Sequence, residues 1–184
     1  MLVLLDRDGV INEDLSGGVQ NVPALRLIPR AAAAMAMLKQ AGMKLAIVTN
    51  QSAVGRGLIT QLQLEAIHSH LHSLLVAEGV AVDAIFTCTD HPDHATHRRK
   101  PGDGMLREAL QQFGALPGQT PFIGDALRDL QAAAAAGCPR YLVRTGKGAT
   151  TEAAGLPDSV NPVLVFHDLY DAALHIIANP SIRG

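Results

Sequence analysis

The first residues able to do chemistry lie in the segment VLLDRDGVIN, which runs from Val3 to Asn12. In it, Asp6 and Asp8 follow an apolar run and are separated by a single residue. Two carboxylates held this close repel each other unless a cation lies between them. A carboxylate after a strand can attack phosphorus, and a second one two positions further on can transfer protons. The spacing favours magnesium-assisted phosphoryl chemistry, with a solvated turn as the alternative for this motif alone.

Three later stretches carry groups that suit a phosphate and a cation. Thr49 and Asn50 supply a hydroxyl and an amide, although a strand-end turn would use the same residues. Lys100 supplies an ammonium that can offset phosphate charge, with a surface lysine as the alternative. Asp125 adds a third carboxylate, which would complete an all-oxygen magnesium site. Asp129 could cap a helix or support that site.

Apolar runs of strand length alternate with stretches of helical periodicity along the chain. This alternation is typical of parallel strands joined by crossover helices. The candidate strands are Leu2–Leu5, Lys44–Thr49, Val82–Thr87, Pro121–Ile123 and Tyr141–Val143, with Val163–Phe166 as a further candidate at an edge. The candidate helices are Arg30–Gln40, a helix capped by Thr60 that ends at Gly79, Gly104–Phe113, Leu127–Ala136 and Asp168–Ala178.

Polar residues follow directly from four of the candidate strands, namely Asp6 and Asp8, Thr49 and Asn50, Cys88, and Gly124 with Asp125. In an open parallel sheet the ligand lies beyond the carboxyl ends of the strands, so these residues should converge on one rim. We predict an α/β fold, namely a Rossmann-like, doubly wound, mainly parallel sheet with helices on both faces. The gaps after Asp8 and Thr49 leave no room for a separate cap domain, and residues 1–184 are expected to form a single domain.

The composition restricts the class of partner. The 184 residues carry 15 Lys and Arg against 17 Asp and Glu, with no basic run that would suit nucleic acid or a membrane surface. No apolar run approaches the roughly 20 residues of a membrane span, and no secretory leader precedes Asp6. The two cysteines are too few for a disulfide framework. We expect a cytoplasmic monomer that acts on a small diffusible molecule.

The order of the motifs is more specific than any one of them. DxD, then TN, then K, then GDxxxD resembles the haloacid dehalogenase (HAD) superfamily of phosphatases from Asp6 to Asp129. The stretches LDRDGVIN, VTNQSAVGRG, RKPGDGM and GDALRDLQAA are most similar to a branch that removes the 7-phosphate of D-glycero-D-manno-heptose 1,7-bisphosphate. Histidinol phosphatases are near relatives of that branch. A phosphorylated sugar is therefore the expected substrate, with histidinol phosphate as the alternative.

The resemblance also implies roles for individual residues. Asp6 would be the nucleophile and Asp8 the general acid and base, while Thr49 and Lys100 would hold the phosphoryl group. Magnesium would be bound by Asp6, Asp125 and the carbonyl of Asp8, and Arg99 would contribute to substrate recognition. The expected substrate-binding set is Asp6, Arg7, Asp8, Asp14, Leu15, Ser16, Gly17, Thr49, Asn50, Gln51, Ser52, Arg99 and Lys100.

The loop CTDHPDHATHRRKP departs from the HAD pattern. Many relatives bind zinc here through C-x-H followed by C-x-C-R-K-P, but Asp90, Thr96 and Arg98 replace the histidine and the paired cysteines. Four other residues offer new ligands at three-residue spacing, namely Cys88, His91, His94 and His97. Because ligands so closely spaced in one loop seldom close a tetrahedron, we favour a metal-free loop that closes over substrate and keep zinc as the alternative.

A second departure is Ala126, where relatives often have a lysine. Arg128 or Arg56 could supply the missing charge.

Two other classes of function are disfavoured. A signalling receiver domain would need an acceptor aspartate where the second strand ends in Thr49 and Asn50, and a nucleotide-binding scaffold would need a G-x-G-x-x-G motif after the first strand.

Overall fold

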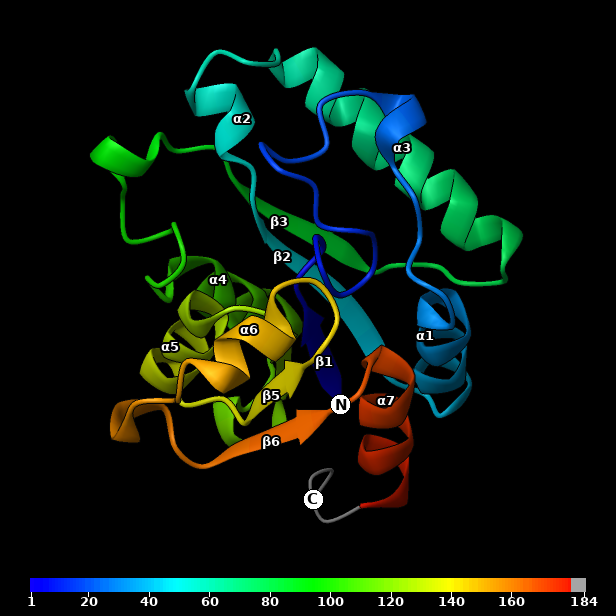
Figure 1. Cartoon of the computed structure of the whole chain (residues 1–184). Coiled ribbons are helices and arrows are strands. Elements are labelled where there is room, and N and C mark those ends of the chain that lie inside the picture. The colour runs from blue at the N-terminus through cyan, green and yellow to red at the C-terminus, as the bar shows by residue number, and fades with distance from the viewer. Residues whose placement is uncertain (180–184) are drawn as a thin grey trace.

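The fold is known from a computed structural model that describes residues 1–179, in which six parallel strands form one sheet (Figure 1). The strand order is β3-β2-β1-β4-β5-β6. This order is that of a doubly wound sheet, whose ligand sites lie at the carboxyl ends of the strands, where the winding direction reverses. The expected fold class is confirmed. The strands are β1 (Leu2–Leu5), β2 (Lys44–Asn50), β3 (Ala84–Cys88), β4 (Phe122–Gly124), β5 (Arg140–Val143) and β6 (Val163–Phe166).

The helices follow the expected periodic stretches closely. Thr60 forms a capping box with Gln63, and Gly114 and Gly137 end two helices in the left-handed conformation that glycine adopts without strain. The helices are α1 (Ala31–Gln40), α2 (Ser52–Gly55), α3 (Gln61–Ala77), α4 (Gly104–Phe113), α5 (Leu127–Ala136), α6 (Gly148–Ala153) and α7 (Leu169–Ala178). The sequence did not predict α2 and α6, which are short. None of the helices within residues 1–179 has the length and apolar character needed to cross a membrane.

Alternate side chains of the central strands β1 and β2 pack into two separate layers of core. Leu5 and Ile47 belong to a core that also includes residues of α1, α3 and α7. Leu4 and Val48 belong to a second core with residues of α4 and α5. Both faces of the sheet are therefore covered, and the buried central strands read as continuous apolar runs.

The register of the strands brings their polar ends to one rim. Leu5, the last residue of β1, lies beside Ile47 of β2 and Ile123 of β4. Asp6 therefore leaves the sheet between the ends of these two strands, and it is 3% exposed. Its backbone N–H donates to the carbonyl of Ile123 (2.9 Å), which fixes the strand end beside Asp125.

Candidate active site

Three carboxylates from separate parts of the chain meet at this rim. Asp6 follows β1, Asp125 follows β4, and Asp129 lies in the first turn of α5. One oxygen of each lies within 4.8 Å of the others, and all three residues are buried. Asp129 also accepts a hydrogen bond from the backbone N–H of Ala126 (3.0 Å), so it caps α5 as well. Sequence reasoning had considered both a capping and a supporting role for Asp129.

The buried side chain of Lys100 places a positive charge beside these carboxylates. Its Nζ lies 2.9 Å from Asp6 and 2.8 Å from Asp129, and it donates to the carbonyl of Val48 (2.9 Å). The backbone N–H and carbonyl of Lys100 are both hydrogen-bonded to the side chain of Asn50. A buried ammonium held from several sides is a fixed positive charge beside the expected nucleophile.

The carboxylates repel one another in the absence of a bound cation. Burial raises the pKa of Asp6 to about 7, although Lys100 acts in the opposite direction. Burial and the charge of Asp129 raise the pKa of Asp125 to about 6. Burial also works against ionisation of Asp129, but Lys100 and Arg128 outweigh it and lower its pKa. Burial is the largest cause of both upward shifts, and the neighbouring carboxylates add to it, so ionised Asp6 and Asp125 are costly in this site.

The surroundings of Asp125 fit a magnesium ion. Its Oδ2 accepts from the backbone N–H of Lys147 (2.8 Å), whereas its buried Oδ1 has no hydrogen-bond partner within residues 1–179. Gly9 and Gly146 pack against this carboxylate with positive φ, and a Cβ on either would collide with it. Oxygen-only ligands, excess negative charge and one unpartnered oxygen are what a hard divalent cation requires.

The carboxylate of Asp8 is hydrogen-bonded to other side chains and lies outside the group of three carboxylates. Both of its oxygens accept from one nitrogen of Arg7 (2.9 and 3.0 Å), and they also accept from Asn12 and Gln51. Burial would raise the pKa of Asp8, but the charge and hydrogen bond of Arg7 outweigh it and lower that pKa. Asp8 is not part of the three-carboxylate group. A contribution of Asp8 to the metal would therefore come from its carbonyl, as the resemblance implies.

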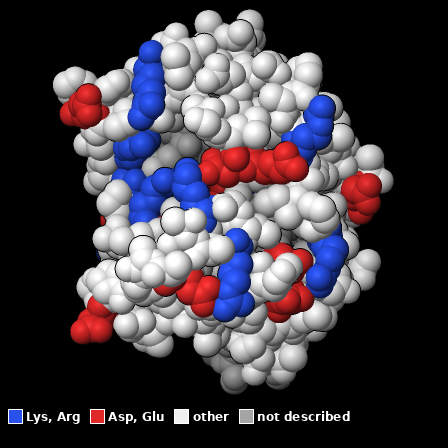
Figure 2. All heavy atoms as spheres, viewed as in Figure 1, with Lys and Arg blue, Asp and Glu red and all other residues white. Residues whose placement is uncertain are grey.

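A cavity of about 510 Å³ lies in front of these residues. In Figure 2 a group of basic side chains borders a hollow that has a band of acidic side chains on its other side. The lining combines the expected residues with several cations: Asp6, Asp8, Asp14, Leu15, Ser16, Gly17, Gly18, Asn50, Gln51, Ser52, Ala53, Arg56, Arg99, Arg128 and Lys147.

Three residues of the expected substrate set lie behind the cavity lining instead. Arg7, Thr49 and Lys100 are at most 1% exposed and are not among the lining residues. Arg7 donates to Asp8 and to Gln51 (3.0 Å), and Gln51 donates to Thr49 (2.8 Å). The side chain of Arg7 therefore orients Asp8 and does not reach into the cavity.

Two of the basic lining residues were anticipated only as compensation for Ala126, and one was missed. Arg56 and Arg128 both line the cavity, so charge is supplied there despite Ala126. Lys147 was not predicted, although its place in a glycine-rich stretch after β5 is a signal that could have indicated it. Lys147 pairs with Asp14 across the cavity mouth at 2.8 Å.

The four candidate zinc ligands are not brought together. No three of Cys88, His91, His94 and His97 form a group of ligand atoms within 4.8 Å in the described part of the chain. Cys88 is fully buried, whereas His94 and His97 are exposed. The donor set of this loop therefore does not fit a tetrahedral zinc site.

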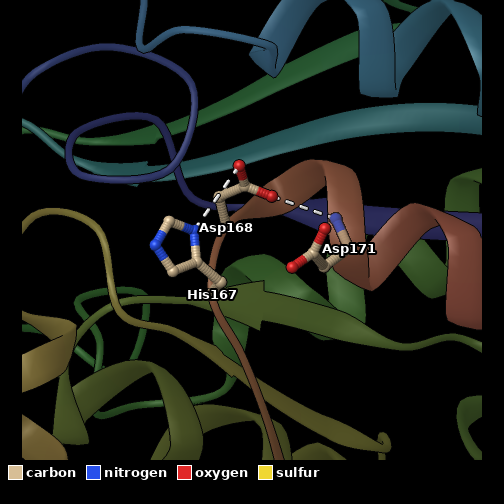
Figure 3. A group of neighbouring side chains, drawn as sticks. All are labelled: His167, Asp168 and Asp171. Atoms are coloured by element: carbon tan, nitrogen blue, oxygen red, sulfur yellow. Dashed lines mark hydrogen bonds and ion pairs between the residues drawn. The ribbon is translucent and has the colours of Figure 1, made fainter.

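A second acidic group, at the start of α7, is a structural contact (Figure 3). Asp168 accepts from the backbone N–H of Asp171 (3.0 Å) and so caps the helix. Arg30 pairs with both aspartates, at 3.3 and 3.0 Å, while His167 is 75% exposed. Asp168 is thus explained as a helix cap, and Arg30 compensates part of the charge of the two carboxylates.

Comparison with known proteins gives concordant matches. Residues 97–172 match the family model described as HAD-hydrolase-like. The chain is 43% identical over 158 residues to D-glycero-beta-D-manno-heptose-1,7-bisphosphate 7-phosphatase of Bordetella bronchiseptica, which covers 85% of this chain and 88% of that protein. It is 40% identical over 168 residues to the protein of the same name from Pseudomonas aeruginosa, with 91% and 93% covered. The crystal structure of the D,D-heptose 1,7-bisphosphate phosphatase from B. bronchiseptica, complexed with magnesium and phosphate, superposes with a TM-score of 0.91 at 40% identity, covering 97% and 98% of the two chains.

Proposed function

Since the chain belongs to the HAD-like phosphatases, we propose that it is a magnesium-dependent phosphoric monoester hydrolase that removes the 7-phosphate of D-glycero-D-manno-heptose 1,7-bisphosphate. One observation carries the proposal. The Asp6 carboxylate lies in a three-carboxylate group, 2.9 Å from the buried Lys100 ammonium, at a cavity that three arginines also line. A nucleophile, a fixed positive charge and sites for further anions are the parts that phosphoryl transfer from a bisphosphate needs.

Asp6 is the proposed nucleophile of the first step. Its Oδ1 accepts from the backbone N–H of Arg7 (2.7 Å) and its Oδ2 faces Lys100, so the carboxylate is held in one orientation. Attack on phosphorus forms a bond from an Asp6 carboxylate oxygen to phosphorus and breaks the bond to the sugar oxygen, which takes the proton of protonated Asp8. Since Arg7 outweighs burial and lowers the pKa of Asp8, this step uses the minor, protonated form of that residue. Magnesium bound by the carboxylates of Asp6 and Asp125 would neutralise charge on the transferring phosphoryl group.

Asp8 serves the second step as a base. Arg7, Asn12 and Gln51 fix its carboxylate at the cavity edge, where it is 14% exposed and within reach of water. Asp8 accepts a proton from a water molecule, whose oxygen attacks the phosphorus bound to Asp6. Inorganic phosphate leaves and the Asp6 carboxylate is restored. Thr49, Asn50 and Lys100 are the proposed positioning groups for the phosphoryl oxygens.

The cations of the cavity support a substrate with a second phosphate. Burial lowers the pKa of Arg99, and the nearby charges of Arg128 and Arg56 lower it further. Within residues 1–179 the buried Nε of Arg128 has no hydrogen-bond partner. Burial would lower the pKa of Arg128, but the acidic residues around it, above all Asp129, raise that pKa, so Arg128 remains a cation beside Arg99. Guanidinium groups bind phosphate through paired hydrogen bonds, and the three arginines of the cavity lining are candidates for such contacts. We assign the 1-phosphate to these arginines and the sugar hydroxyls to the loop from Asp14 to Gly17.

The same arginines disfavour histidinol phosphate. That molecule carries one phosphate and a positively charged amine, and it would place the amine near Arg56, Arg99 and Arg128. Like charges at this separation cost binding free energy. The names of the relatives agree with a heptose bisphosphate. The expectations of one domain over residues 1–184, of a monomer, of cytoplasmic residence and of no nucleic-acid or membrane partner stay predictions.

A substrate panel tests the assignment. We would measure kcat/KM with magnesium for the α and β anomers of the heptose 1,7-bisphosphate, the heptose 7-phosphate, histidinol phosphate and common sugar monophosphates. A heptose bisphosphate anomer is expected to rank first, ahead of the 7-phosphate, because only the bisphosphate fills the arginine site. A higher kcat/KM for histidinol phosphate would overturn the substrate, and no hydrolysis of any monoester would overturn the enzyme class.

A further inference from the structure

The loop of residues 89–99 forms most of the connection between β3 and α4. Its last residue is Arg99, which is followed directly by Lys100, and both residues belong to the candidate site. Figure 1 shows it as a long connection beside the edge of the sheet. Its regular structure is limited to a single turn at Pro92–His94. Lys100 is anchored independently by Asn50 and by the carbonyl of Val48. Within residues 1–179 no hydrogen bond ties Arg99 to a strand, so the position of its side chain depends on what orders the loop.

One part of the answer is Arg98. Its Nε and Nη2 donate to the two oxygens of Glu108 in α4, at 2.6 and 2.9 Å, and its Nη1 donates to the carbonyl of Thr87 in β3 (3.1 Å). A two-pronged contact between a guanidinium and a carboxylate fixes orientation as well as distance. Arg98 therefore ties the end of the loop to both elements that the loop connects.

The other part is Asp90, which closes the loop on itself. Its Oδ2 accepts from both the backbone N–H and the hydroxyl of Thr96, each at 2.7 Å. The hydroxyl of Thr96 accepts in turn from the backbone N–H of Arg98 (3.2 Å). The carbonyl of Asp90 accepts from Nη1 of Arg99 at 3.4 Å. Asp90 thus links the start of the loop to the side chain that lines the cavity.

These contacts involve the same positions at which the chain departs from the zinc-binding pattern. Asp90, Thr96 and Arg98 stand where that pattern has a histidine and two cysteines, and each of them makes a contact that orders the loop. The histidines of the loop are at least partly exposed and do not assemble with Cys88 into a ligand group in the part of the chain described.

We propose that the contacts Asp90–Thr96 and Arg98–Glu108, here called the loop clasp, replace zinc in this protein and hold Arg99 in position for the second phosphate of the substrate. Asp90, Arg98 and Glu108 are thus positioning residues that act through Arg99. The assignment of Arg99 to that phosphate rests on the proposed function, whereas the metal-free loop does not.

A conservative substitution tests the clasp against a matched control. Glu108→Gln removes the carboxylate that holds Arg98 and keeps the size of the side chain. Asp103→Asn makes the equivalent change in a different ion pair at the start of α4, that of Asp103 with Arg107, whose guanidinium also donates to the carbonyl of Ala135 in α5. Glu108→Gln should raise KM for the heptose bisphosphate by about threefold to tenfold with kcat within about twofold, because Lys100 keeps its own anchors. KM for a monophosphate should not change in either variant.

Two readouts do not depend on activity. Amide hydrogen exchange of residues 89–99 should be faster in Glu108→Gln and unchanged in Asp103→Asn. Metal analysis of the purified wild type should find far less than one equivalent of zinc, and protein treated with a chelator should regain full activity with magnesium alone. One equivalent of zinc, or equal exchange in both variants, would overturn the clasp.

The kinetic measurements separate the ordering of the loop by the clasp from the role of Arg99 in binding the second phosphate. If exchange quickens in Glu108→Gln but KM for the bisphosphate equals that of Asp103→Asn, the role of Arg99 in binding the second phosphate is wrong. If the wild type does not hydrolyse the bisphosphate at all, the proposed function fails, and the exchange and zinc results still decide whether the clasp holds the loop.

Discussion

The ionised carboxylate of Asp6 destabilises the fold and is the group that the proposed chemistry uses. Its carboxylate is 3% exposed and faces two other carboxylates, with Lys100 as the compensating charge. Burial raises its pKa to about 7, which means that its ionised form costs free energy in the folded protein. A carboxylate kept in such a place is explained by chemistry and not by packing.

The first prediction concerns this residue. Asp6→Asn should lower kcat by more than about 10³-fold, because an amide does not form the phosphoryl intermediate. The variant should melt at the wild-type temperature or higher in magnesium-free buffer, since the buried charge is removed. Steady-state kinetics and thermal unfolding followed by circular dichroism measure both. Asp93→Asn, at an 81% exposed carboxylate, is the control and should match the wild type. Magnesium-dependent turnover of Asp6→Asn within tenfold of the wild type would contradict the role.

At the scale of elements, one histidine of α3 interacts electrostatically with the loop that carries Asp6 and Asp8. His68 lies on α3, and its Nε2 is buried with no hydrogen-bond partner within residues 1–179. Burial, together with the nearby positive charge of Arg7, lowers the pKa of His68 from 6.5 to about 4. His68 is half-buried, and the charges of both Arg7 and Asp8 act on its pKa, so it lies near the loop that carries these residues.

The second prediction follows from the sign of this shift. The unfolded chain binds a proton on His68 below about pH 6.5, whereas the folded protein does so only near pH 4. The free energy of unfolding should therefore fall as the pH decreases from 6.5 to 4, by at most about 1.4 kcal/mol per pH unit. His68→Gln should lack this part of the pH dependence, so the variant gains stability relative to the wild type between pH 7 and pH 5.

Urea unfolding at several pH values measures the difference. His72→Gln, at an exposed position of the same helix, provides the control and should keep the wild-type pH dependence. A stability difference between His68→Gln and the wild type that stays constant from pH 7 to pH 5 would show that His68 does not titrate differently on folding.

At the scale of the whole molecule, the candidate metal site joins segments that are remote in sequence. Asp6 comes from the end of β1 and Asp125 from the end of β4, while Asp129 belongs to α5. Lys147 closes the far side through its backbone N–H on Asp125. A cation bound here neutralises several charges at once, so its binding free energy adds to the stability of the whole fold.

The third prediction is a metal-linked rise in melting temperature. At a magnesium concentration 100 times its dissociation constant, linkage adds about 2.7 kcal/mol, or about 5 to 10 °C for a chain of this size. Asp125→Asn should lose most of this rise. Asp158→Asn, at an exposed aspartate, should keep it. Differential scanning fluorimetry with magnesium chloride, and with sodium chloride at equal ionic strength, measures the effect. Equal rises in both variants would place the cation elsewhere.

Much of the fold could be predicted from the sequence because its signals are local. Apolar runs and helical periodicity placed all six strands and five helices close to their observed bounds, and strand ends identified Asp6, Asp8, Thr49 and Asp125. The short helices α2 and α6 were missed because four and six residues carry too little periodic pattern. The basic lining of the cavity was only partly anticipated, since the contacts of Lys147 with Asp14 and Asp125 join segments that are far apart in the chain.

The sequence by itself determined the order of the elements and the presence of acidic and basic groups at the carboxyl ends of the strands, because the period of a pattern and the end of a strand are properties of adjacent residues. Only the tertiary structure decided which atoms face each other. It turned the carboxylate of Asp8 to Arg7 and Gln51, set Lys100 against Asp6 and Asp129, and paired Arg98 with Glu108. Those choices depend on burial, which sets the cost of each charge, and on packing between segments far apart in the chain.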